Sequence, residues 1–289
     1  MGTGISAASG RLVAGVGCAA FLLAGLAGCK ASSASEHKGK ANAPENIKGG
    51  SGVEQVDPST WRKWGLKPMR PAPAPPADAD KPIRLSKKGP AKVFSTVPTK
   101  EKIVFVTIDD GAEKDPRFVE MARELRVPFT MFLMNDAILA NYGYFKPLQA
   151  LGNHVQNHTL NHPVMRNLGP EAQKAQICGD QTILVKQYTT RPYLFRPPYG
   201  MYNMATQEAA ASCGIHGIAL WRESMQIHDM QYDDGMRKLH PGDIILAHFR
   251  GPKELKGSTM TQMFAALLKH ITKQGYTVAR LEDYVRPPA

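Results

Sequence analysis

The chain has 289 residues and a formal net charge of +11. That length suits one α/β domain of about 200 residues with a tail, or two small domains, and it leaves the fold class open. Most of the basic charge is near the amino terminus, where residues 30–99 hold thirteen Lys or Arg against six Asp or Glu, an excess of seven. No helix-turn-helix, zinc-finger or aromatic RNA-binding signature accompanies this charge, which argues against a specific nucleic-acid partner. A basic segment of this kind favours binding to anionic lipid headgroups or wall polymers.

The first 29 residues have the anatomy of an export signal. Arg11 precedes an apolar stretch from Leu12 to about Gly28, and small residues lead to Cys29. The sequence "LAGC", which ends at Cys29, resembles a bacterial lipobox. This resemblance implies a signal peptide over 1–28, a lipid on the Cys29 sulfur, and a protein anchored to the membrane outside the cytoplasm. The alternative, an uncleaved anchor helix, fits less well because the run is short and rich in Gly and Ala.

Residues 29–91 are expected to form a flexible, basic, Pro-rich tether. Up to about Gly52 there is almost no large apolar side chain whose burial could offset the cost of ordering. The segment "STWRKWGL" at 59–66 interrupts this pattern with two tryptophans, and we expect it to pack on the domain, with a partner or the wall as the rival contact. Residues 67–82 are rich in Pro and predict an extended spacer.

From residue 92 the pattern alternates between short apolar runs and amphipathic segments. The expected strands are 102–108, 128–134, 154–159, 193–200 with its turn, 215–221, and the second half of 234–249, whose first half is expected to end a helix. The expected helices are 115–127, 144–152, 169–188, 203–214 and 259–275. This alternation predicts parallel strands joined by helical crossovers.

Of four cysteines, two belong to the predicted signal and lipidation site. Cys178 and Cys213 remain. Outside the cytoplasm they can pair, or they can stay as a buried free pair, and the sequence leaves both open.

Two groups of polar residues point to metal chemistry. Asp109 and Asp110 end the run "FVTIDD", and functional groups gather where parallel strands end. His158 and His162 are four residues apart, a spacing that can direct both imidazoles at one point. One carboxylate and two imidazoles form a metal-binding triad with open positions, and the second aspartate is then available as a base.

Three further stretches follow in order: "RPPYG" at 196–200, "LWRESM" at 220–225 and "IILAH" at 244–248. With "TIDDG" and "HTLNH", they resemble the five motifs of the polysaccharide deacetylase family (carbohydrate esterase family 4, with its NodB-homology domain) over about 92–285, and all but "LWRESM" match closely and in the expected order. The resemblance implies a catalytic domain over 92–289, folded as a distorted, incomplete (β/α) barrel of seven or eight strands. It also implies one divalent metal ion, usually zinc, with cobalt or another transition metal as alternatives.

The resemblance also assigns roles. Asp110, His158 and His162 would bind the metal, and Asp109, held by Arg196, would be the catalytic base. The backbone N–H of Tyr199 would bind the oxyanion, Leu246 would line the acetyl pocket, and His248 would be the general acid. An amide hydrolase needs these parts: an activated water, a base, an oxyanion donor and an acid.

The fourth motif departs from the family. With Trp221 aligned as a sugar-contacting residue, Ser224, Ile227 and His228 stand where the family has two aspartates and a tryptophan. Asp229 or Glu223 can replace the missing support for the acid, and His228 can line the cleft, or these residues are ordinary surface groups. The other histidines of the domain lack partners at ligand spacing, so core or surface roles are expected for them: His154, His216, His240 and His270.

The sequence thus predicts a monomeric, membrane-anchored metallohydrolase that removes N-acetyl groups from an aminosugar polymer. Peptidoglycan is the expected substrate because the tether places the enzyme at the wall, and chitin oligomers are an alternative. An O-acetyl esterase on xylan or wall glycans, an amidase on other amides, and a weak or inactive wall-binding homologue remain rival hypotheses.

Overall fold

A computed structural model describes residues 56–288 of the chain. The predicted signal peptide, the predicted lipidation site at Cys29 and the expected tether up to residue 55 lie outside the described residues. Within 56–288, every helix is too short or too polar to cross a membrane.

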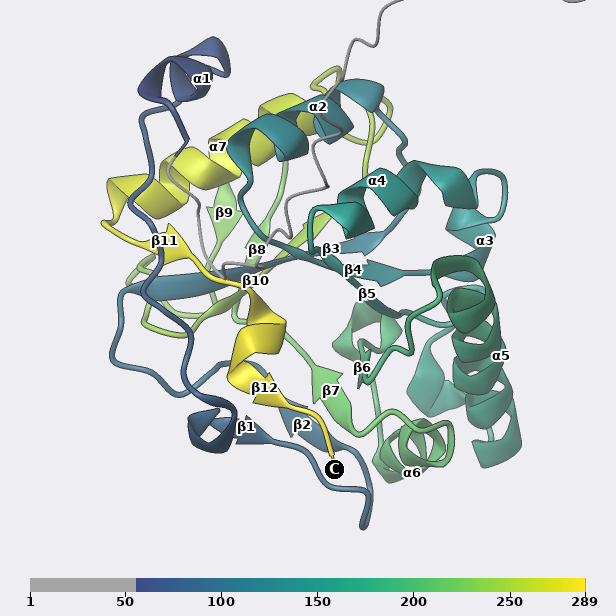
Figure 1. Ribbon diagram of the computed structural model, residues 1–289. Helices are drawn as coiled ribbons and strands as arrows, with labels where there is room; N and C mark the ends of the chain where they lie inside the picture. Colours follow the sequence, from purple (N-terminus) through teal and green to yellow (C-terminus); the bar gives the residue numbers. More distant parts are fainter. Residues whose placement is uncertain (1–55, 289) are drawn as a thin grey trace, which may run out of the picture. The chain divides into compact units, whose positions relative to one another are not determined.

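A single large sheet organises the described residues (Figure 1). Its strands lie in the order β2 (Lys92–Phe94), β7 (Gly217–Ala219), β6 (Leu194–Phe195), β5 (His154–Asn157), β4 (Thr130–Leu133), β3 (Ile103–Asp110), β10 (Ile244–His248), β8 (Glu223–Met225) and β9 (Met230–Gln231). A tenth strand, β11 (Thr277–Val278), pairs with the start of β3. All pairs are parallel except the β8–β9 hairpin.

The sheet curls but stays open, since the outer strands β2 and β9 do not pair with each other to close it. Without the hairpin strand β9 and the short β11, eight of the ten strands remain, all of them parallel. The expected distorted, incomplete (β/α) barrel is therefore confirmed.

β3 runs through the centre of this sheet. Seven of its eight residues are buried, which explains why its sequence is a continuous apolar run instead of an alternating one. Its neighbours β4 and β10 are equally buried over their apolar residues. The carboxyl ends of β3, β4, β5 and β10 therefore meet at one rim.

Helices cover the sheet. They are α2 (Pro116–Leu125), α3 (Asn135–Ile138), α4 (Phe145–Ala150), α5 (Pro170–Tyr188), α6 (Met204–Ser212) and α7 (Met260–Lys273), with 3₁₀ turns at Asp78–Asp80, Tyr142–Tyr144, Met165–Asn167, Pro198–Gly200 and Leu281–Tyr284. α2 packs against α7, and α5 against α6 (Figure 1). Edge-on contacts of Phe118 with Phe249 and Phe264 fill the space beneath α2 and α7.

The ends of α2 and α7 follow from their sequences. Asp115 accepts a hydrogen bond from the N–H of Arg117, with Pro116 in the first turn of α2. Thr259 and Gln262 form a reciprocal capping box at the start of α7.

Residues 56–91 correct the predicted tether, because this part of it is folded onto the domain. The short helix α1 (Pro58–Lys63) contacts α2, and Trp61 is only 1% exposed within the main core. β1 (Ile83–Arg84) pairs in parallel with β12 (Val285–Arg286). The few apolar side chains between the prolines are buried, and this burial offsets the cost of ordering the segment. Residues 59–66 do pack on the domain, as expected.

The helix end expected in the first half of 234–249 is wrong. Residues 234–243 form turns and loop. The Asp234 carboxylate accepts hydrogen bonds from the N–H groups of Met236 and Arg237, an arrangement that competes with helix formation. Gly235 and Pro241 also disfavour a helix there.

Candidate metal centre and catalytic site

The two aspartates end β3 in a sharp backbone turn. Asp109 is 2% exposed, Asp110 has a φ of 71°, and Gly111 has a φ of 88°. Only glycine fits at 111, since a Cβ there would lie 2.4 Å from Cγ2 of Ile138. Because the backbone of Asp110 is left-handed, the side chains of Asp109 and Asp110 contact different residues.

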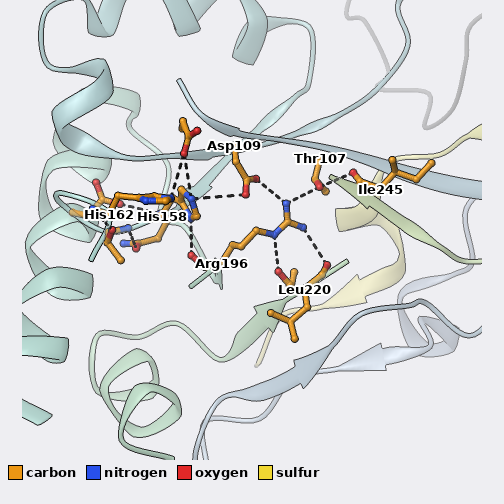
Figure 2. A network of polar contacts seen from close by, with 12 residues as sticks. Thr107, Asp109, His158, His162, Arg196, Leu220 and Ile245 are labelled. Carbon is orange, nitrogen blue, oxygen red and sulfur yellow. Dashed lines mark hydrogen bonds and ion pairs between the residues drawn. The ribbon is translucent and has the colours of Figure 1, made fainter. Parts of the chain in front are cut away.

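Asp110 faces both predicted ligand histidines. Its Oδ1 lies 3.5 Å from Nε2 of His158 and 3.5 Å from Nε2 of His162. The two imidazole rings have centroids 5.0 Å apart, and Figure 2 shows them side by side. The structure thus brings these three residues together.

A strained loop holds the histidines. Thr159 and His162 have φ values of 74° and 60°, which are unfavourable for residues with a Cβ. The side chain of Asn157 accepts from the N–H of Thr159, and Thr159 Oγ1 accepts from the N–H of His162. These bonds fix a conformation that costs about 1–3 kcal/mol at each strained residue, as is common at functional sites.

The hydrogen bonds of His158 define its free nitrogen. Nδ1 of His158 donates to the carbonyl oxygen of Arg196 at 2.7 Å, so a neutral ring presents the lone pair of Nε2 to Asp110. Oδ1 of Asp110 is buried and has no hydrogen-bond partner among the described residues. A buried carboxylate oxygen that faces two imidazole nitrogens is a donor set that fits a divalent transition ion.

Burial and mutual charge shift the pKa values of this group in opposite directions. Burial opposes charge on both Asp110 and His158. The interaction with His158 nevertheless lowers the pKa of Asp110, and the charge of Asp109, followed by that of Asp110, raises the pKa of His158. Burial, followed by repulsion from His158, lowers the pKa of His162. A negative carboxylate and a neutral His162 are both ready to act as ligands.

Asp109 has a separate partner, Arg196. Nη1 of Arg196 donates to Oδ1 of Asp109 at 2.7 Å and to Oγ1 of Thr107 at 2.7 Å (Figure 2). The remaining guanidinium nitrogens donate to the carbonyl oxygens of Ala219 and Leu220. Burial lowers the pKa of Arg196, and the charge of Asp109 works against this change. The arrangement fixes the orientation of Asp109, whose Oδ2 lies 3.8 Å from Nε2 of His158.

His248 lies beside Asp109 at the end of the neighbouring strand. The two residues are register partners of β10 and β3. Burial lowers the pKa of His248 to about 4, and the charges of Asp109 and Asp110 oppose the shift. On the same strand Leu246 is buried and pairs with Thr107.

Tyr199 and Trp221 come from two further loops. Tyr199 has a φ of 60° and is 59% exposed, and its ring centroid lies 4.7 Å from that of His162. Trp221 packs against Gly200, where a Cβ would lie 3.1 Å from the indole, and its ring lies 5.5 Å from the guanidinium carbon of Arg196. Both aromatic residues therefore adjoin the metal and base groups.

The altered fourth motif leaves His248 without a carboxylate from β8. Ser224 accepts a hydrogen bond from the side chain of Gln226, and exposed His228 contacts Ser258. Glu223, one expected substitute, instead neighbours Asp243. The carboxylates whose charge reaches His248 are Asp109 and Asp110.

Two contributors were not anticipated from the sequence. Thr107 accepts from Arg196 and donates to the carbonyl oxygen of Ile245; its position two residues before Asp109 on a strand was the available signal. Asp180 on α5 accepts from the backbone N–H of His158 at 3.2 Å. No local pattern marks Asp180, because its role depends on how α5 packs against β5.

Cys178 and Cys213 form a disulfide that joins α5 to the residue after α6. The alternative of a buried free pair is therefore wrong in this structure.

Comparisons with known proteins agree with this geometry. A family model described as polysaccharide deacetylase matches residues 96–218. An uncharacterised protein of Streptomyces coelicolor is 40% identical over 73% of this chain and 82% of its own length. A peptidoglycan-N-acetylglucosamine deacetylase of Bacillus cereus is 27% identical over 66% of this chain and 91% of its own.

A solved structure of a carbohydrate esterase family 4 pseudoenzyme from Bacillus anthracis has the same fold. It superposes with a TM-score of 0.56 at 21% identity, over 68% of this chain and 70% of that one.

Proposed function

This chain belongs to the polysaccharide deacetylase family, and from that premise we propose that it removes N-acetyl groups from an aminosugar polymer, with peptidoglycan as its substrate. The observation that carries the proposal is the union of an Asp–His–His donor set with a separate, arginine-held aspartate at one rim of the sheet. The name of the Bacillus cereus relative supports peptidoglycan.

The metal of this proposal is one divalent ion, with zinc the best match to a carboxylate and two imidazoles. Asp110, His158 and His162 would hold it. Such an ion acts as a Lewis acid that lowers the pKa of a coordinated water and polarises a carbonyl group.

The chain's own residues supply the proton transfers. Asp109 accepts a proton from water, because Arg196 fixes the position of its side chain. The backbone N–H of Tyr199 donates to the oxyanion that develops from the acetyl carbonyl. His248 donates a proton to the departing amine nitrogen, while Leu246 and Trp221 contact the acetyl group and the sugar.

The pKa of His248 shapes this proposal. With a pKa of about 4, His248 is neutral before reaction at neutral pH, so it must gain the proton that it later donates. Its register partner Asp109, which takes a proton from water, is the adjacent source. A proton passed between these neighbours would replace the support that the usual fourth motif gives.

The proposed location is the outer face of the membrane, through a lipid on Cys29. We propose a monomer with the glycan and the membrane as its partners, without a nucleic acid. The lipobox-like sequence before Cys29 supports the anchor, and a membrane-bound enzyme would meet the wall polymer directly.

The deciding experiment measures acetate released from peptidoglycan and from chitin oligomers by the full zinc-loaded chain in detergent. We expect Asp109→Asn and His248→Ala to lower the rate by about 10²–10⁴-fold, the usual worth of general acid–base catalysis. Asp80→Asn, the same change at an exposed aspartate, should match the wild type.

Two other results would redirect the proposal. Acetate released from acetylxylan alone would identify an O-acetyl esterase. Retention on peptidoglycan without acetate release, unchanged in Asp109→Asn, would identify a wall-binding homologue. Equal release by wild type and Asp109→Asn would overturn the role of the base.

A further inference from the structure

A second group of potential ligands lies at the opposite end of the sheet from the catalytic site. Glu223 is the first residue of β8, Asp243 directly precedes β10, and His240 lies three residues before Asp243. His248 ends the same strand β10, five residues after Asp243, which at about 3.3 Å per residue is roughly 16 Å away. This group is therefore separate from Asp110, His158 and His162.

Two carboxylates are buried here without compensation. Glu223 is 0% exposed and Asp243 is 1% exposed. Both carboxylate oxygens of Glu223, and Oδ1 of Asp243, lack hydrogen-bond partners among residues 56–288. Buried carboxylates are normally paired or bound to a metal, because leaving them bare costs several kcal/mol each.

The geometry brings three different ligand atoms to one point. One oxygen from each carboxylate and one nitrogen of His240 all lie within 4.8 Å of one another. The ligand atoms of a tetrahedral ion with bonds of about 2.1 Å are about 3.4 Å apart. Side-chain rotations that bring the three atoms closer by at most about 1.4 Å would close the group onto one ion.

The backbone around Asp243 is rigid enough to hold such a site. Oδ2 of Asp243 accepts from the N–H of His240 at 2.5 Å, which leaves Oδ1 free to face Glu223. Gly242 has a φ of 87°, and a Cβ there would lie 1.8 Å from the carbonyl oxygen of Val97. The turn 240–243 is thus fixed against a neighbouring strand segment.

His240 has the surroundings of a metal-ligating histidine. Its Nε2 lies 3.6 Å from Oδ2 of Asp234, while its Nδ1 lies 3.6 Å from Asp243 and makes no hydrogen bond within the described part of the chain. A carboxylate on one ring nitrogen orients the other toward a metal. Its side chain is 43% exposed, so an ion can enter from solvent.

The local charge also favours a cation. Asp233 and Asp234 lie beside the group, and the nearby cation Arg222 is already paired with Asp233. Burial, followed by repulsion from Asp243, raises the pKa of Glu223 to about 9. A proton shared between Glu223 and Asp243 is the competing explanation of the same geometry.

We propose that Glu223, His240 and Asp243 form a second divalent-metal site, selective for a transition ion such as Zn²⁺. The imidazole and the small number of ligands favour zinc over Ca²⁺ or Mg²⁺, which take six or more oxygen ligands. The ion joins the start of β8 to the start of β10. It does not contact the catalytic groups.

The test counts zinc ions per full chain by equilibrium dialysis and elemental analysis, after removal of metal with a chelator. The wild type should bind two ions. Glu223→Gln/Asp243→Asn should bind one, and His158→Ala/His162→Ala should also bind one. If the catalytic metal centre were absent, the wild type would bind one ion and Glu223→Gln/Asp243→Asn would bind none. These results separate failure of this inference from failure of the proposed function.

A second readout removes dependence on one variant. In the His158→Ala/His162→Ala background, zinc should raise the melting temperature, because it binds the folded state alone. Adding His240→Gln at the half-exposed position should weaken zinc affinity by at least about 10-fold. Adding His154→Gln, a change at an exposed histidine outside the group, should leave it unchanged.

The inference is overturned if folded His158→Ala/His162→Ala binds no zinc, which would leave the shared proton as the explanation. It is also overturned if that variant binds Ca²⁺ in preference to zinc, or if His154→Gln weakens zinc binding as much as His240→Gln does.

Discussion

Arg196 and Asp109 form a fully buried ion pair in which Nη1 donates to Oδ1 at 2.7 Å. The pair joins the turn after β6 to the end of β3, and three further donors of the guanidinium bind Thr107 and two backbone carbonyls. Breaking such a pair differs from removing it, because a lone buried charge has no compensation.

Arg196→Met should therefore destabilise the fold by about 3–5 kcal/mol, since it leaves Asp109 buried and unpaired. Adding Asp109→Asn should recover a large part of that loss, and urea denaturation measures both. Lys63→Met, which removes an exposed ion pair with Glu120 and Glu124, should cost much less than Arg196→Met. A double variant as unstable as Arg196→Met would show that the pair is not the source of the loss.

Trp61→Ala should lower the free energy of unfolding by about 3–5 kcal/mol, because the indole is buried in the main core. Trp64→Ala should cost less, since Trp64 is only partly buried, although its Nε1 donates to Glu124 at 2.7 Å. Urea denaturation of both variants provides the comparison. A loss below about 1 kcal/mol for Trp61→Ala would restore the view of residues 56–91 as a loose tether.

When a chelator keeps the protein free of metal, the free energy of unfolding should depend on pH through the carboxyl group of Glu223. Its pKa rises from 4.5 to about 9 on folding, so between these values the folded state holds a proton that the unfolded state has released. Stability therefore falls as pH rises through this window, by at most about 1.4 kcal/mol per pH unit for one group. Glu223→Gln should flatten the profile measured by urea denaturation from pH 5 to 9; an unchanged slope would contradict the assignment.

Reduction of the Cys178–Cys213 disulfide should lower the free energy of unfolding by about 2–4 kcal/mol, as expected for a closed loop with a sequence separation of 35. Cys178→Ala/Cys213→Ala should show the same loss and no further response to reductant. Denaturation with and without dithiothreitol checks both statements. If the double variant still responded to reductant, the effect would come from another group.

The sequence predicted the parts of the fold that local pattern controls. Residues close together in the sequence determine the buried run of β3, the amphipathic faces of α2 and α7, and the alternation of strands and helices. The packing of 56–91 was not fully predictable, because Met69 and Ile83 stand in Pro-rich stretches and are buried only by distant elements. Likewise, Asp234 replaced an expected helix end with a turn through its own side chain.

The candidate site shows the same division. The aspartates, the two histidines, Arg196 and His248 belong to compact motifs, and the structure brings them to one rim. The role of Asp180 and the left-handed backbone conformation of Asp110, Thr159, His162 and Tyr199 were outside the reach of sequence patterns. His240 was expected to be an ordinary histidine because its neighbours Glu223 and Asp243 are assembled by strand pairing and loop geometry, not by spacing along a helix.

The pairing of β1 with β12 has a consequence for how the chain reaches its final state. Ile83 aligns with Val285, so a segment early in the described part of the chain must wait for one about 200 residues later. Contacts between such distant positions slow folding, because a long loop must close before they can form. In a nascent chain β1 therefore stays without its strand partner until synthesis has delivered Val285.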